Sequence, residues 1–142
     1  MLTNPDSKEG RQLVALIHTI DHMQRLHERC DEDLERAIIA SHRSELVDAK
    51  QVLDEHIDTI IDAVEARRSE LAAEIAPLTH ARTREMETAG RDRIYQSVAR
   101  DLLNVRYATE CAEALRWLTR VSRHISRICH YLNQGMPESG KP

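Results

Sequence analysis

The sequence has few of the residues from which sheets and phosphate-binding loops are built. Its 142 residues include no Phe, one Trp, three Tyr, four Gly and four Pro. A β-sandwich or barrel needs many turns and strands of aromatic or β-branched residues, so this composition argues against both. The two interior glycines, Gly10 and Gly90, stand alone, which argues against a glycine-rich nucleotide loop. Long helices remain.

The chain also lacks a basic excess, a disulfide framework and a long apolar run. Its net charge of −4 gives no global argument for nucleic-acid binding. Cys30, Cys111 and Cys129 cannot pair completely and show no CxxC spacing, and the first ten residues lack the apolar core of a signal peptide. We therefore expect a reducing, cytoplasmic location and no membrane-spanning segment.

The spacing of apolar residues predicts a long first helix. After an N-cap at Asp6 or Ser7, spacings of three and four residues define a heptad seam, which consists of Leu13, Leu16, Ile20, Met23, His27, Cys30 and Leu34. A helix with such a seam is expected to pack lengthwise on its neighbours. A bend is expected near residues 36–43.

Three further helices are expected. The second runs over residues 46–75 and ends at Pro77, whose ring clashes with the preceding turn. The third covers 78–104, and the fourth begins at an N-cap on Thr109 and carries an apolar stripe of Cys111, Leu115, Leu118, Val121, Ile125, Ile128 and Leu132. Residues 134–142 form a flexible tail. Residues 1–142 are thus predicted to be a single all-α domain, an up-and-down antiparallel bundle of three to four long helices.

Two ladders of opposite charge follow helical spacing. The basic ladder, in the last helix, consists of Arg116, Arg120, Arg123 and Arg127. The acidic ladder, in the second helix, consists of Asp54, Asp58 and Asp62. The arginines either pair with these carboxylates or present their guanidinium groups to an anionic partner. We favour ion pairs between the two helices, with anion or partner binding as the alternative.

Two segments combine an apolar seam with Arg and His at helical spacing: residues 20–29, IDHMQRLHER, and residues 120–132, RVSRHISRICHYL. They resemble motifs of the PhoU-like domain family, particularly the cytoplasmic PhoU-like domain of sodium/phosphate cotransporters. The matching positions are Asp21, His22, Arg25, Arg29, Arg120, Val121, His124, Arg127 and Ile128.

The resemblance implies a helical, non-enzymatic regulator of phosphate transport, located in the cytoplasm or at the inner face of the membrane. Its partner would be a transporter, another protein or a second copy. The residues expected to bind that partner or an anion are Asp21, Arg25, Arg29, Arg120, Arg123 and Arg127. Some family members bind metal through pairs of acids four residues apart. Here the residue four positions after Asp21 is Arg25, and in the last helix Arg123 and His124 stand where acids would be needed. Those metal sites do not carry over, and no cofactor is expected.

A metal-binding bundle is the alternative hypothesis. His18 and His22 are four residues apart, the spacing with which two imidazoles share a metal on one helical face. Asp21 could join them, and further ligands would come from the second helix, which offers His56, Asp58 and Asp62. No Ser or Cys stands in a local signature with a His and an acid, so no catalytic residue is expected. The charged helix edges argue against a large hydrophobic interface.

Overall fold

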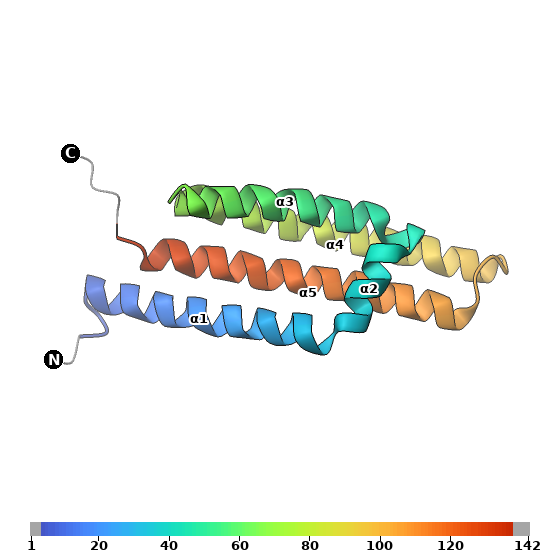
Figure 1. The fold of residues 1–142 in the computed structure, drawn as a ribbon, viewed down its shortest axis with the longest axis horizontal. Helices are drawn as coiled ribbons and strands as arrows, with labels where there is room; N and C mark the ends of the chain where they lie inside the picture. Colours follow the sequence, from blue (N-terminus) through green and yellow to red (C-terminus); the bar gives the residue numbers. More distant parts are fainter. Residues whose placement is uncertain (1–3, 138–142) are drawn as a thin grey trace.

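The computed structural model describes residues 4–137, which form helices joined by short turns (Figure 1). The elements are α1 (Lys8–Glu32), α2 (Leu34–His42), the short 3-10 helix η1 (Ser44–Leu46), α3 (Val47–Glu65), α4 (Ser69–Ala99) and α5 (Val105–Gly135). This part of the chain contains no strand, so the all-α prediction is confirmed. It also contains no helix that is long and apolar enough to cross a membrane.

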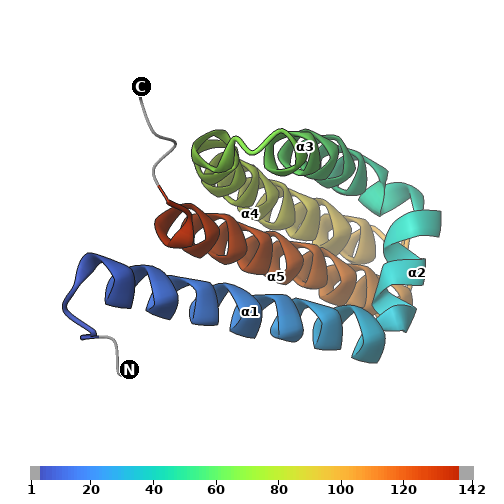
Figure 2. The same cartoon turned by 60° about the vertical axis from the view of Figure 1, so that its left-hand side comes forward.

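The four long helices lie side by side with alternating directions, in the spatial order α1, α5, α4, α3 (Figures 1 and 2). α5 packs against both α1 and α4, and α4 packs against α3. Within the described residues α1 and α3 do not contact each other, and α2 crosses α5 at one end to connect them. The arrangement is therefore an open layer, in which α1 and α3 are the two edges.

α5 provides much of the core. The first part of its predicted stripe is buried, as expected, and Leu46, Leu53 and Ile94 pack against it from neighbouring elements. At the other end of the layer a smaller cluster consists of Ile60, Ala63, Ala72, Ala76 and Cys129. Burial raises the pKa of Cys129 to about 11, so this thiol stays protonated and packs as a small apolar group.

The predicted boundary between the second and third helices is wrong. α3 ends at Glu65, and Arg67 adopts a left-handed conformation with φ of 57° in the turn that follows. α4 then runs through Pro77 to Ala99, so the expected helix over 78–104 is only its second part. An interior proline costs a helix about 3 kcal/mol. Pro77 lies on the exposed side, while the opposite side of α4 buries Ala72, Ala76, Thr79 and Thr83 against its neighbours, which outweighs that cost.

Two further boundaries differ from prediction. α5 is capped by Asn104, whose side chain accepts a hydrogen bond of 2.8 Å from the N–H of Tyr107, and not by Thr109. The bend expected at 36–43 is itself the helix α2, with breaks before and after it at Asp33 and Arg43. Helix α5 continues to Gly135, and residues 138–142 of the expected tail lie outside the described residues.

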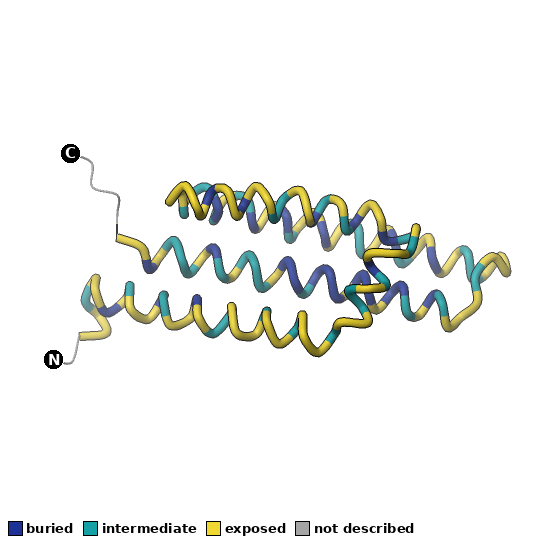
Figure 3. Tube along the Cα trace, in the orientation of Figure 1, coloured by how far each residue is buried: buried dark blue, intermediate teal, exposed yellow. Residues whose placement is uncertain are grey.

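The heptad seam of α1 is not buried as predicted. Small residues make much of the contact with α5: Ala15 and Thr19 are buried, and a Cβ on Gly135 would lie 2.6 Å from Cδ2 of Leu16. Ile20 and Met23 are more than half exposed, and Figure 3 shows α1 as the most exposed of the long helices. Periodicity identified the helix correctly but placed the covered side wrongly.

Candidate functional site

A ladder of arginines runs along the outer side of α5. Arg116, Arg123 and Arg127 are exposed and Arg120 is half-buried. Within residues 4–137 none of the four forms an ion pair: the salt bridges of this range involve other cations. Their guanidinium groups therefore keep all their donors available for a partner.

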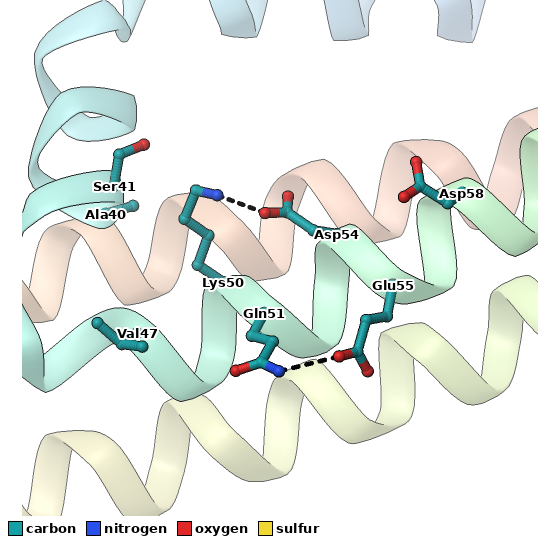
Figure 4. A pocket seen from close by; sticks show the side chains of 8 residues that line it. All are labelled: Ala40, Ser41, Val47, Lys50, Gln51, Asp54, Glu55 and Asp58. Atoms are coloured by element: carbon teal, nitrogen blue, oxygen red, sulfur yellow. Dashed lines mark hydrogen bonds and ion pairs between the residues drawn. The ribbon is translucent and has the colours of Figure 1, made fainter.

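The prediction that these arginines pair with the acidic ladder of α3 is wrong. Lys50 of the same helix pairs with Asp54. Figure 4 shows this pair, the parallel contact of 2.9 Å from Gln51 to Glu55, and Asp58 without a partner among the residues drawn. α3 and α5 touch mainly through core residues, and within residues 4–137 no ion pair joins the carboxylates of α3 to the arginines of α5.

Basic side chains from three adjacent helices surround the ladder. Burial lowers the pKa of His80 on α4, and Arg123, Arg84 and Arg127 lower it further through their positive charge. Burial also lowers the pKa of His22 on α1. The negative charge of Asp21 raises this pKa, whereas the positive charge of Arg127 lowers it. We call this surface the basic face and define it by Arg25, Arg29, Arg84, Arg120, Arg123 and Arg127. It lies on a chain whose net charge is −4.

Histidine and tyrosine rings of α1 and α5 pack against each other beside the basic face. Tyr131 stacks on His18 with 4.8 Å between ring centroids and on His22 with 5.6 Å. The ring of His22 also lies 5.8 Å from that of His124. The Nδ1 atoms of His22 and His124 are buried without a hydrogen-bond partner. The segments predicted at 20–29 and 120–132 are thus in direct contact.

The remaining predicted site residues lie on α1. Asp21 binds Arg25 over 3.0 Å, and Arg29 lies 3.7 Å from Asp33, so both arginines already have an acidic neighbour. Asp21, Arg25 and Arg29 border a groove of about 460 Å³ between α1 and α5, which is also lined by Gln24, Glu28, Glu32 and His124. The groove mixes charges, whereas the ladder on α5 is purely basic.

The proposed metal ligands do not come together with the expected acids. His18 and His22 lie on α1, whereas His56, Asp58 and Asp62 lie on α3, which α1 does not touch. His56 instead contacts Oγ1 of Thr79 at 2.8 Å. Across residues 4–137 no three His, Cys, Asp or Glu side chains are grouped closely enough to hold a metal ion.

Sequence reasoning missed the contribution of α4. His80 and Arg84 are four residues apart, and His80 contacts the hydroxyl of Ser122 at 2.8 Å. The signal was present in the stretch HARTR at residues 80–84, which puts His80 and Arg84 on one side of a helix. This stretch lies inside the helix predicted over residues 78–104, but its sequence does not show that the helix packs beside the arginines of α5.

The histidines beside the basic face predict a pH dependence of stability. Burial, above all, lowers the pKa values of His22 and His124. Between these lowered values and the ordinary histidine pKa of about 6.5, the unfolded chain binds more protons than the folded one. The stabilisation is therefore complete above about pH 6.5 and is lost as the pH falls through the lowered pKa values. Urea unfolding should show a lower midpoint at pH 5 than at pH 7.5.

The variant His22→Gln/His124→Gln separates this effect from other titrations. We expect a smaller drop in the urea midpoint between the two pH values than in wild type. Replacing the exposed His27 and His42 by glutamine provides a matched control that should keep the wild-type drop. An equal drop in all three proteins would show that other groups cause the acid sensitivity.

The comparisons with known proteins add no relative. No protein-family model, no curated protein and no solved structure matches this chain.

Proposed function

We propose that this chain is a non-enzymatic, PhoU-like regulatory domain of phosphate transport, which acts by docking the basic face onto an acidic surface of a transporter. The observation that carries the proposal is the unpaired arginine ladder of α5. Four guanidinium groups on one side of a helix, without carboxylate partners in the described chain, contribute little to folding. They are suited to bidentate recognition of carboxylates or phosphate groups.

The packing of α1 on α5 gives further support. The two segments that resemble PhoU-like motifs meet through His22, His124 and Tyr131, which supports a single surface that spans α1 and α5. Arg25 and Arg29 extend the ladder across α1, and Arg84 extends it across α4. The three packed helices fix the backbone positions of these arginines relative to one another, which reduces the entropy cost of binding.

Phosphate uptake in the native host tests the proposal. The gene is deleted, and uptake of radiolabelled phosphate is measured after the wild-type chain or the variant Arg120→Ala/Arg123→Ala/Arg127→Ala is reintroduced. We expect wild type to restore the normal uptake and the ladder variant to fail, because it lacks the contacts with the transporter.

A charge-matched control removes three exposed arginines elsewhere: Arg68→Ala/Arg93→Ala/Arg100→Ala. This protein should restore uptake like wild type, since its charge change is the same and its basic face is intact. Restoration by the folded ladder variant would overturn the role of the basic face. Uptake that does not respond to deletion of the gene would overturn the link to phosphate transport.

A further inference from the structure

One histidine of α4 lies among arginines of two helices. Nδ1 of His80 lies 2.8 Å from Oγ of Ser122 on α5, so the two helices meet at this point. Arg84 follows His80 by one turn on α4, and Arg123 directly follows Ser122 on α5. The charges that act on His80 are those of Arg84, Arg123 and Arg127, and all three are positive. Positive charge is therefore concentrated around a single imidazole.

The three arginines approach His80 from two directions. α4 and α5 run in opposite directions, so Arg84 and Arg127 lie on either side of the contact between His80 and Ser122 (Figure 1). A rise of 1.5 Å per residue places them about 6 and 7.5 Å from this contact along the helix axes, distances that extended arginine side chains span. Like Arg123, both are exposed, and within residues 4–137 none of the three forms an ion pair.

The hydrogen bonds of Ser122 fix the position of the proton on neutral His80. The hydroxyl of Ser122 donates its single proton to the carbonyl oxygen of Thr119 over 2.8 Å. It therefore accepts from Nδ1–H of His80, and Nε2 of the neutral ring carries a lone pair. Such a nitrogen cannot donate to an anion, whereas the protonated ring offers Nε2–H. An anion that binds at Nε2 thus requires a second proton on His80.

We propose that a free dianion of the phosphate type binds here, between the three arginines and the protonated ring of His80. We call this place the anion site and define it by His80, Arg84, Arg123 and Arg127. A carboxylate carries one negative charge on two oxygens, whereas a phosphate group carries about two charges and three or more acceptor oxygens. Three guanidinium groups and an imidazolium therefore match a phosphate group better than a carboxylate.

The arginines of the anion site belong to the basic face. This proposal therefore deepens the proposed function, on which it rests for the role of these arginines in recognition, and it names the phosphate group as the chemistry that they recognise. The two proposals fail separately, because anion binding is measured on the purified chain and docking is measured by phosphate uptake in the host.

Histidine NMR spectra of the whole chain test the site without altering it. Sulfate is the probe, because it keeps both negative charges between pH 5 and 8. At constant ionic strength it should raise the pKa of His80, since a bound dianion stabilises the protonated ring. The exposed His27 and His42 are internal controls and should not respond. An unchanged pKa of His80, or an equal rise in chloride, would overturn the proposal.

Calorimetric titration with inorganic phosphate tests the arginines. Arg84→Gln/Arg123→Gln should bind phosphate about tenfold more weakly or worse, because it lacks two charge-assisted contacts. The matched control, Arg68→Gln/Arg93→Gln, makes the same charge change at exposed positions outside the basic face and should bind like wild type. Equal weakening in both variants would show a general effect of charge and would overturn the site.

The pH dependence of sulfate binding tests the role of His80. Wild type should bind sulfate more tightly at pH 5.5 than at pH 7.5, because binding takes up a proton. His80→Gln keeps the three arginines but should lose most of this difference. A difference that persists unchanged in His80→Gln would overturn the inferred contact with the protonated ring.

Flotation with phosphatidylcholine vesicles that contain phosphatidic acid separates a free anion from a lipid headgroup. His80 is half-buried between the helices, where a small anion fits better than a headgroup held in a membrane. We expect the chain to bind inorganic phosphate and not to float with the vesicles. Flotation without binding of inorganic phosphate would overturn the proposal in favour of a membrane surface.

Discussion

Replacing Leu115 by alanine should lower the free energy of unfolding by about 2–5 kcal/mol. Leu115 lies at the centre of α5, is 2% exposed and fills the space left by Gly90 of α4. A Cβ on Gly90 would lie 2.9 Å from Cδ1 of Leu115, so the two helices pack closely at this point. Truncation removes the buried side chain and leaves a cavity, because its neighbours cannot collapse fully into the gap.

Urea unfolding followed by circular dichroism measures this loss. The matched control is Leu78→Ala, which truncates a leucine that is 69% exposed on α4 and should cost less than about 0.5 kcal/mol. A loss for Leu115→Ala no larger than that of the control would contradict the packing of α5 against α4.

Replacing Trp117 by alanine should have an effect of similar size, about 3–5 kcal/mol. Trp117 is 9% exposed, packs in the main core cluster, and its Nε1 donates a hydrogen bond of 3.4 Å to the carbonyl oxygen of Arg29 on α1. The substitution removes both the largest side chain of the core and a link that holds the end of α1 to α5. We therefore also expect the substitution to speed up the hydrogen exchange of α1, relative to wild type, more than that of α4.

Tyr95→Ala is the control for this substitution, because Tyr95 is an aromatic residue of α4 that is half exposed. It should lose much less stability and should leave the exchange of α1 unchanged. If Trp117→Ala destabilised the protein without a preferential effect on α1, the inferred attachment of α1 through Trp117 would be wrong.

The sequence predicted the helical class and the core of α5 but not the neighbours of each helix. The stripe that includes Cys111, Leu115 and Leu118 is buried because a long amphipathic pattern on a central helix has covering elements on several sides. The seam of α1 is equally regular in its spacing, but α1 lies at the edge of the layer, so part of the seam stays exposed. Periodicity reports that a helix has an apolar side, whereas the topology decides what covers it.

The predicted helix boundaries are wrong for a related reason. The turn at 66–68 contains neither glycine nor proline, since Arg67 itself adopts the left-handed conformation. Conversely, Pro77 lies inside α4, where burial of small residues on the opposite side holds the helix together. In both cases tertiary packing outweighs local preference, and a local pattern carries no information about it.

The candidate site could be predicted in part. Helical spacing correctly placed the arginines of α5 along one side, and the segments at 20–29 and 120–132 proved to be neighbours. The pairing of Arg120, Arg123 and Arg127 with Asp54, Asp58 and Asp62 could not be judged, because spacing within a helix does not fix how two helices are rotated relative to each other. The basic face is visible only once α1, α5 and α4 are packed.

We propose that the arginines of α5 serve recognition and not folding. Urea unfolding of Arg120→Ala/Arg123→Ala/Arg127→Ala at low salt tests it most directly, because ion pairs contribute most to stability under that condition. We expect this variant to have the same unfolding midpoint as wild type and unchanged helicity. A clearly lower midpoint that approaches the wild-type value when salt is added would show that these arginines form stabilising ion pairs, and it would contradict the claim.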